Sequence, residues 1–302
     1  MRPDEDSLLA VCHFPPPGAA VDLAVSGGPD SLGLLQLALA GALAVTVHHV
    51  DHHVRPTSTD DAHFVAAVCE GLGVPFVLHD VRIATGGNFE SRARSARRGA
   101  MPASVMTGHT MDDLVETLLL NMRRGAGVDG LSPMVGDPTK PLRDVRRGVL
   151  HDYVHSSSLR PRVDETNESP AFRRNRVRHE LLPVMRNVAE RDVVPLLARQ
   201  AALMHEERVW LDQLSRDDVA VVLAKADCRE LRRWPTARLR RWLRVELRTP
   251  DQGDGDHPPS ADEVERAISV VRGEAVATEL SGGRRLARRG QRLTLTKARP
   301  LR

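Results

Sequence analysis

The chain lacks long apolar stretches and has few cysteines. No run of its residues approaches the roughly 20 apolar residues that a membrane-spanning helix needs. The opening segment 1–6 does not have the charged-then-apolar order of a signal peptide. The cysteines Cys12, Cys69 and Cys228 lie far apart and form no CxxC pair. We therefore expect neither a membrane protein, nor a disulfide framework, nor a cysteine metal site, and we expect a cytoplasmic location.

Lysine and aromatic residues are also scarce. Only Lys140, Lys225 and Lys297 are lysines among 43 basic residues, and there are one Tyr, three Trp and five Phe. Residues 1–140 hold 10 basic and 16 acidic side chains, whereas residues 141–302 hold 33 and 24. A GC-rich genome would equally explain the preference for arginine codons, but it explains the separation of the charges less well. Because arginine binds phosphate bidentately, the basic half indicates nucleic-acid binding through arginine more than through aromatic stacking.

Strand-like and helix-like segments alternate through the first half. The expected strands cover 21–25, 44–48, 75–81 and 103–108, and the expected helices cover 30–40, 57–71, 88–100 and 111–122. This order predicts an α/β fold with a doubly wound, mostly parallel sheet that binds ligands at the carboxyl ends of its strands.

The pattern changes after residue 125, and a length of 302 residues favours two domains. We expect a loop over 130–143, helices within 180–214, 228–247 and 261–271, and strands over 284–287 and 293–296. We place the first domain at 1–190, with a core at about 20–145 and an Arg-rich segment at 146–190. The second, smaller domain is helical or α+β and comprises a helical linker and a basic carboxyl-terminal part over 191–302.

The segment Ser26-Gly27-Gly28-Pro29-Asp30-Ser31 follows the first apolar strand and opens a helix. The glycines permit positive φ, Pro29 suits the first helical turn, and N–H groups at the helix start form a cradle for pyrophosphate or triphosphate. Asp30 would repel phosphate directly, so its expected role is through a bridging Mg²⁺, and Ser31 can donate a hydrogen bond. The alternative is a strand-to-helix turn without a ligand.

Acidic side chains follow two of the expected strands. On a helix after residue 108, His109, Asp112, Asp113 and Glu116 share one face and point to the same crevice as the glycine loop. This face could hold Mg²⁺ or an amine; the alternative is a helix cap at Asp112 and a solvated surface. Asp51 ends the second strand, where an acid often meets a nucleotide ribose, although a turn residue would also fit.

Arginines gather at three places along the chain. They are Arg173, Arg174, Arg176 and Arg178 around Asn175, the pair Arg123 and Arg124, and the pair Arg94 and Arg97 on the helix before the fourth strand. The guanidinium groups of the first two of these places would suit the phosphates of a polynucleotide or the charge on ATP. A solvated basic helix start is the competing interpretation.

The glycine loop resembles the SGGxDS signature of the PP-loop ATPases, which cut ATP to AMP and pyrophosphate by adenylating a substrate oxygen. It is neither a Walker A sequence nor GxGxxG. Further segments resemble one family of that class, tRNA-isoleucine lysidine synthetase. They are VDHHVR at 50–55, GHTMDDLVET at 108–117 with RRG at 123–125 and GL at 130–131, and DETN at 164–167 with RNRVR at 174–178 and LP at 182–183. Order and spacing agree over about residues 20–185, and the chain resembles the shorter members.

The resemblance implies a ligase that joins L-lysine to C2 of the wobble cytidine, position 34, in the CAU anticodon of tRNA-Ile. The cytosine O2 attacks the α-phosphate of ATP and releases pyrophosphate, and the lysine ε-amine then attacks C2 and expels AMP. ATP and Mg²⁺ are the implied cofactors, and the anticodon region of tRNA and L-lysine are the implied partners. No membrane is implied, and a homodimer is left open.

The resemblance also implies roles for individual residues. ATP binding is expected of Ser26, Gly27, Gly28, Pro29, Asp30, Ser31, Asp51 and His109. Catalysis is expected of Asp30, Asp112, Asp113, Glu116 and Arg123, with Asp30 as the Mg²⁺ ligand. Binding of RNA or substrate is expected of Arg94, Arg97, Arg124, Arg174, Asn175, Arg176 and Arg178. Arg98 stands where the family has an aromatic residue, so no stacking role is carried over to it.

Three other functions are compatible with an adenylating or nucleotide-binding fold. A PP-loop tRNA thiolase also adenylates a base but commonly has clustered cysteines, and this chain has no CxxC pair. An amidotransferase-type synthetase would need a glutaminase with a nucleophilic cysteine. A non-catalytic nucleotide-binding or RNA-binding module would gain nothing from the carboxylates at 112–116 beside a phosphate cradle.

Overall fold

The computed structural model describes residues 4–51, 58–81, 99–157, 159–162, 173–217, 226–248 and 259–297. The chain forms two compact units, Met1–Arg208 and Val209–Arg302. The division falls within helix α9 (Val194–Asp217), whereas the sequence pattern favours a boundary near residue 190. The first turns of α9 belong to the first unit because Val194, Ala198 and Ala201 are buried in its core.

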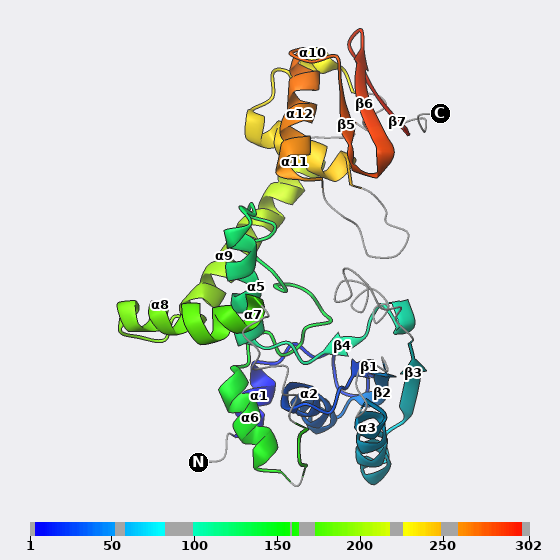
Figure 1. Cartoon of the computed structure of the whole chain (residues 1–302), viewed down its shortest axis with the longest axis vertical. Helices are drawn as coiled ribbons and strands as arrows, with labels where there is room; N and C mark the ends of the chain where they lie inside the picture. The colour runs from blue at the N-terminus through cyan, green and yellow to red at the C-terminus, as the bar shows by residue number, and fades with distance from the viewer. Residues whose placement is uncertain are drawn as a thin grey trace. The chain divides into compact units, whose positions relative to one another are not determined.

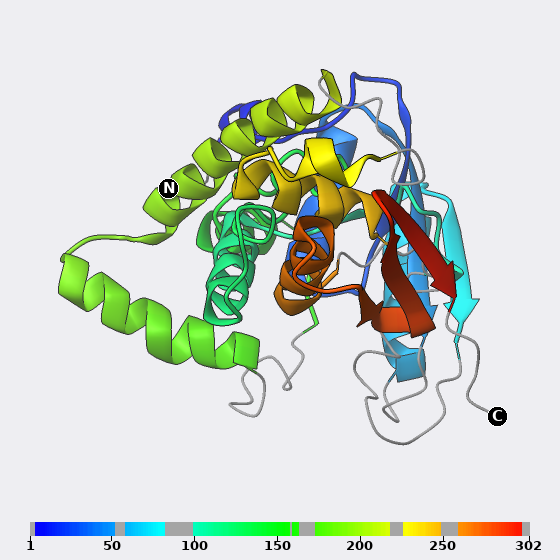
Figure 2. The ribbon, with the colours of Figure 1, turned by 90° about the horizontal axis from the view of Figure 1, so that it is seen from above.

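Four parallel strands form the sheet of the first unit, in the order β3-β2-β1-β4 (Figure 1). They are β1 (Ala20–Ala24), β2 (Ala44–Asp51), β3 (Phe76–Asp80) and β4 (Met106–Thr107). The second view shows β3, drawn in cyan, at one edge of this sheet (Figure 2). The expected parallel α/β fold is confirmed. β4 is shorter than the expected strand because Val105 N–H closes a turn on Pro102 and Thr107 N–H bonds to Thr139.

The described helices of the first unit follow the expected order, with additions. They are α1 (Glu5–Ala10), α2 (Pro29–Ala40), α3 (Ser58–Leu72), α5 (Met111–Arg123), α6 (Arg147–His155), α7 (Arg173–Arg176), the π-helical turn η2 (Val177–Leu181), α8 (Leu182–Ala189) and α9. The sequence patterns did not predict α1, α6 or α7, and η2 begins before the expected helical run. The expected helical run through 180–214 is interrupted at Glu190, whose φ is +52°. The helix expected over 88–100 lies outside the described residues except at positions 99–100.

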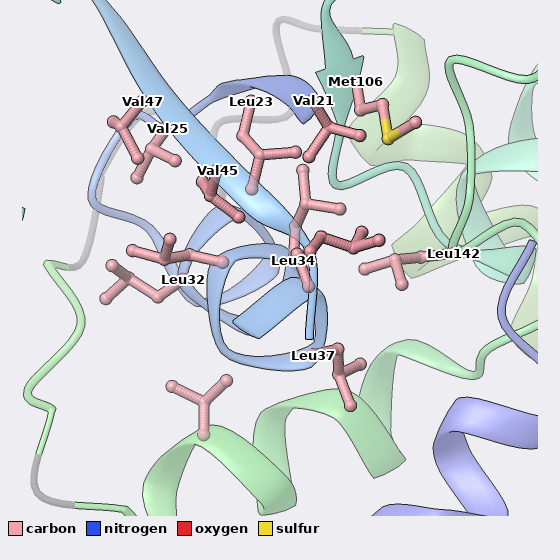
Figure 3. Packing of buried hydrophobic residues seen from close by; sticks show 14 of the residues in the cluster. Val21, Leu23, Val25, Leu32, Leu34, Leu37, Val45, Val47, Met106 and Leu142 are labelled. Carbon is pink, nitrogen blue, oxygen red and sulfur yellow. The ribbon is translucent and has the colours of Figure 1, made fainter. Parts of the chain in front are cut away.

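The core of the first unit surrounds α2. Leu32, Leu34, Leu35 and Leu37 on this helix are fully buried, so the helix is enclosed on several sides rather than amphipathic. Figure 3 shows valine and leucine side chains of β1 and β2 directed at α2. Helix α6 packs on α2 at Gly33, where a Cβ atom would lie 2.5 Å from Leu150 Cδ1. This packing fixes the start of α6 relative to the start of α2.

The second unit has its own core of helices and an antiparallel sheet. Its described elements beyond α9 are α10 (Cys228–Leu231), α11 (Thr236–Glu246), α12 (Ala261–Arg272), β5 (Ala277–Leu280), the 3-10 turn η4 (Ser281–Gly283), β6 (Arg284–Arg289) and β7 (Arg292–Lys297). The strands pair in the order β5-β6-β7, and β5 was not expected from the sequence. Leu239, Leu243, Val271 and Leu286 are fully buried between the helices and the sheet. Within the described residues, no helix is long and apolar enough to span a membrane.

Candidate active site

The loop between β1 and α2 turns sharply at Gly27. This residue has a φ of +88°, and a Cβ atom here would lie 3.2 Å from the Phe64 ring of α3. Both the conformation and the space therefore favour glycine. Gly28 is the N-cap of α2, and Pro29 is its first residue, where a missing N–H leaves no hydrogen bond unmade. We call residues 26–31 the phosphate loop.

A buried serine organises the backbone of the phosphate loop. Ser31 is 8% exposed, and its Oγ accepts a hydrogen bond from Ser26 N–H at 3.2 Å and donates one to the Gly28 carbonyl at 2.9 Å. The Ser26 hydroxyl lies 3.3 Å from the same Oγ. The N–H groups in the first turn of a helix have no acceptor within the helix. The start of α2 therefore presents donors and a positive dipole end to an anion.

Gly108, which follows β4, brings a second motif beside the phosphate loop. A Cβ atom on Gly108 would lie 2.4 Å from the Asp30 carbonyl oxygen and 3.1 Å from Ser31 N. Only glycine permits this approach between the two backbones. The chain then enters α5 through a capping box, in which Thr110 N–H and Thr110 Oγ1 both donate to Asp113 Oδ2 at 2.8 Å. The start of α5 is thereby fixed next to the start of α2.

The carboxylates of α5 are paired with arginines from three other elements. Glu116 is fully buried and accepts from Arg147 Nη1 at 2.9 Å, Arg174 Nε at 2.7 Å and Arg178 Nε at 2.8 Å. Asp113 Oδ1 accepts from Arg147 Nη2 at 2.6 Å and Arg174 Nη2 at 3.2 Å. We call these five residues the Arg/Glu cluster. It connects α5 to α6, α7 and η2.

The cluster keeps its carboxylates ionised. Burial would raise the pKa of Asp113, but Arg147, Arg174, His109 and the Thr110 N–H outweigh this effect and lower the pKa to about 2. Burial likewise opposes ionisation of Glu116, and the hydrogen bond from Arg178 and the charge of Arg147 lower its pKa. Both side chains are therefore charged and already paired near neutral pH.

Two further carboxylates, Asp30 and Asp112, lie in the first turns of α2 and α5. His151 Nε2 is 2.8 Å from Asp30 Oδ1, and Arg147 Nε is 3.7 Å from Asp30 Oδ2. Asp112 accepts from the Arg147 backbone N–H at 2.8 Å and from two nitrogens of Arg146 at 3.2 Å. Asp112 thus caps the start of α6, whereas the sequence interpretation considered a cap on its own helix.

The other predicted site residues occupy varied positions around this region. Asp51 is buried at the end of β2, and His109 Nδ1 lies 2.6 Å from Thr107 Oγ1. Asn175 is 7% exposed between Arg174 and Arg176. Arg176 is exposed and pairs with Glu180 one turn later.

The structure does not bring the two arginines at the end of α5 to the cluster. Arg123 is ten residues after Asp113 on α5, which corresponds to about 15 Å along the helix axis. Arg123 and Arg124 are both exposed. Arg94 and Arg97 lie outside the described residues.

Known proteins share the segments that build this site. The PP-loop domain model matches residues 7–185, which contain the phosphate loop, α5 and the arginines of the cluster. The tRNA(Ile)-lysidine synthase of Thermobifida fusca (strain YX) is 37% identical over 66% of this chain and 67% of its own length. The synthase of Rhodococcus jostii (strain RHA1) is 34% identical over 74% of each chain.

The chain belongs to the tRNA(Ile)-lysidine synthase family. A solved structure adds support for the fold alone. A U34-tRNA thiolase from Methanococcus maripaludis, with its [4Fe-4S] cluster, has a TM-score of 0.50 and 17% sequence identity, covering 63% of this chain and 73% of that one. The family resemblance expected from the sequence motifs is thereby confirmed.

Sequence reasoning missed two side chains of this site, Arg147 and His151. Both lie on α6, where Arg147, Leu150, His151 and Val154 share one face. That spacing is a helical signal, but Gly148 and the length of nine residues obscure it. The proximity of α6 to α2 depends on tertiary packing, which the local sequence pattern does not indicate.

The donors at the phosphate loop fit one type of magnesium site. No group of three or more His, Cys, Asp or Glu side chains is arranged to hold a metal in the part of the chain that the structure describes. Mg²⁺ nevertheless needs only one or two carboxylates when nucleotide phosphates supply further oxygens. Asp30 is one-third exposed and lies at the loop, so its carboxylate suits such a shared site.

Proposed function

We propose that the protein joins L-lysine to C2 of the wobble cytidine in the CAU anticodon of tRNA-Ile, with ATP as the activating substrate. The observation that carries this proposal is the backbone contact between Gly108 and Asp30. It sets a phosphate loop and a charged cluster side by side at the carboxyl edge of one parallel sheet. The relatives named tRNA(Ile)-lysidine synthase support the choice of reaction.

The reaction needs an electrophilic centre on ATP and a good leaving group on the base. In the first step, the cytosine O2 attacks the α-phosphate and pyrophosphate leaves. The start of α2 would hold the phosphates by its N–H donors and dipole. In the second step, the lysine ε-amine attacks C2 and AMP leaves, so the O2 oxygen departs as part of a phosphate ester rather than as hydroxide.

Asp30 is the residue that would hold a magnesium ion together with the nucleotide. The ion would supply neutralisation of phosphate charge, as it does in other phosphoryl and nucleotidyl transfers. The His151 contact on Oδ1 orients the Asp30 carboxylate. Because Gly108 fixes the Asp30 backbone, this carboxylate has a defined position relative to α5.

The arginines divide into two groups by their partners. Arg147, Arg174 and Arg178 are held by Glu116, so their guanidinium groups are oriented before any substrate binds. The side chains of Arg174 and Arg178 remain partly exposed, at 34% and 27%. We assign these two to RNA phosphates or the reacting base, and Glu116 and Asp113 to holding them. We assign the exposed Arg123 and Arg124 to RNA phosphates outside the reacting centre.

The second unit offers another basic surface for tRNA. In the antiparallel register, Arg289 lies opposite Arg292 and Arg285 opposite Thr296, so these side chains share one face of the sheet. The other face carries the buried Leu286 and packs into the core. All three arginines are exposed. This face suits contacts with a phosphate backbone, which do not depend on base sequence.

The decisive experiment is to incubate the protein with ATP, labelled L-lysine and a tRNA-Ile transcript that carries the CAU anticodon. We expect label in the RNA and an equal amount of AMP, both dependent on ATP. A matched transcript with uridine in place of cytidine at position 34 should take up no label. If label stays out of the CAU transcript and AMP does not accumulate, the proposal is wrong.

Sulfur transfer to tRNA is the nearest alternative, and the cysteines do not favour it. Cys69 and Cys228 are fully buried. Burial, and to a smaller extent the negative charge of Asp144, raises the pKa of Cys12 to about 12. Reactive thiols require a lowered pKa and access to solvent. Incorporation of labelled sulfur in the same assay would reverse this preference.

A further inference from the structure

Arg147 lies between the phosphate loop and the Arg/Glu cluster and uses only part of its donor set. Its Nη1 and Nη2 donate to Glu116 and Asp113 at 2.9 and 2.6 Å. Its Nε is buried and has no hydrogen-bond partner among the described residues. The nearest acidic atom that the structure gives for this nitrogen is Asp30 Oδ2, at 3.7 Å, which is beyond hydrogen-bond distance.

A buried N–H without an acceptor is uncommon, and its surroundings indicate what would satisfy it. Buried polar groups in proteins are nearly always paired, and an exception calls for an explanation such as strain, a catalytic role, or a bound water or ion. The Arg147 side chain is only 14% exposed, so bulk water does not readily replace the partner. Asp30 belongs to the phosphate loop, so the open donor lies beside the region where an anion would bind.

The guanidinium group is also held rigidly. Two buried carboxylates bind its terminal nitrogens, and the backbone N–H of Arg147 donates to Asp112 at 2.8 Å. Helix α6 is fixed on α2 by the contact of Leu150 with Gly33. A donor that is oriented in advance loses little conformational entropy when it binds its acceptor.

We propose that Arg147 Nε–H donates to a phosphate oxygen of the nucleotide held at the phosphate loop, with Asp113 and Glu116 as its positioning residues. This inference rests on the proposed function, because it requires ATP to bind at residues 26–31. It assigns to Arg147 a contact with the nucleotide that Arg146, its neighbour on the chain, does not make. Arg146 instead pairs with Asp112 and Asp192.

The test compares affinities for ATP and adenosine, measured by calorimetry with Mg²⁺ and without tRNA. Arg147→Lys should weaken ATP binding by about 10-fold or more, since a charge-assisted hydrogen bond is removed. Its affinity for adenosine should stay within about twofold of the wild type. Arg146→Lys, the matched control, should change neither affinity. An Arg147→Lys variant that binds ATP as tightly as the wild type would overturn the inference, as would equal losses for ATP and adenosine.

A second pair of variants covers the case in which Arg147→Lys does not fold. Asp113→Asn with Arg147→Gln removes one buried carboxylate together with the guanidinium, and Asp113→Asn alone is its reference. The double variant should show the lower ratio of ATP to adenosine affinity, and equal ratios would overturn the inference. If the wild type neither binds ATP nor modifies tRNA, the proposed function itself fails. If it does both and the ratios are equal, only the role of Arg147 fails.

Discussion

Gly108 and Asp30 touch through their backbones, because a Cβ atom at residue 108 would lie 2.4 Å from the Asp30 carbonyl oxygen. The two residues belong to motifs that are far apart in the sequence. Their contact determines how close the phosphate loop lies to α5. The geometry of the site therefore depends on a position that has no functional group.

We expect Gly108→Ala to separate the two motifs. The added methyl group meets backbone rather than a flexible side chain, so the variant should lose about 1–3 kcal/mol of stability and most of its lysine incorporation. Chemical denaturation and the tRNA assay measure the two effects. Gly71→Ala is the control: it adds a methyl group to α3 where nothing lies within 4 Å, and it should keep full activity. Wild-type activity in Gly108→Ala would contradict the importance of this contact.

Glu116→Gln tests the carboxylate that holds three arginines. Removing a buried charge leaves Arg147, Arg174 and Arg178 without their shared partner, which should cost about 3 kcal/mol in the free energy of unfolding. Glu180→Gln removes an exposed partner of Arg176 and should leave the unfolding transition unchanged. Equal effects of the two substitutions would argue against a structural role of the cluster.

The stability of the first unit should depend on pH through Asp113. The pKa of Asp113 is about 2 in the folded chain, below its value of about 3.9 in an unfolded chain. Its ionised form therefore stabilises the fold above about pH 4, and this contribution disappears as the pH falls towards 2. The stability difference between wild type and Asp113→Asn should shrink by about 2 kcal/mol over that window. A stability difference between the two proteins that stays constant from pH 7 to pH 2, measured by chemical denaturation, would refute this prediction.

Asp30→Asn separates the proposed metal contact from the fold. The side chain is one-third exposed, and the amide keeps its size, so the melting temperature should stay close to the wild-type value. Turnover should fall by about 100-fold or more if the carboxylate neutralises phosphate charge through Mg²⁺. Steady-state assays over a range of Mg²⁺ concentrations test this. A variant with normal turnover would show that Asp30 is not the metal ligand.

The exposed arginines at the end of α5, Arg123 and Arg124, should contribute to RNA affinity through counterion release. Arg123→Ala with Arg124→Ala should lower the slope of log affinity against log salt by about two, because each arginine is expected to neutralise one RNA phosphate. Filter binding of tRNA at several salt concentrations gives the slope. Arg176→Ala should lower it less, because the Arg176 charge is already paired with Glu180. An unchanged slope in the double variant would show that Arg123 and Arg124 do not contact RNA phosphates.

Local sequence signals were sufficient where a motif lies within one turn or one helix. The phosphate loop follows from Gly27, Gly28 and Pro29, whose conformational preferences fit only a few backbone paths. The face of α5 that carries Asp112, Asp113 and Glu116 follows from helical spacing. The sequence identities to the synthases support the family that these motifs resemble.

Long-range pairing could not be predicted in the same way. Glu116 meets Arg174 and Arg178 across about sixty positions of sequence, at separations of 58 and 62 residues. In the sequence the carboxylates look open to a metal or an amine, because nothing in the local pattern shows that arginines already occupy them. Helix α6 was missed for a related reason: it is short and contains Gly148, and its position depends on packing against α2.

That packing has a practical consequence for anyone who scans this protein by mutation. Apolar packing determines the separation of Arg147 from Asp30. Leu150 of α6 fills the space beside Gly33 of α2, and a Cβ atom on Gly33 would lie 2.5 Å from Leu150 Cδ1. Gly33→Ala would add a single methyl group and would change none of the charged or hydroxyl-bearing side chains of the site. A mutational survey restricted to polar residues would miss this substitution, although the added methyl group would displace the helix that carries Arg147 and His151.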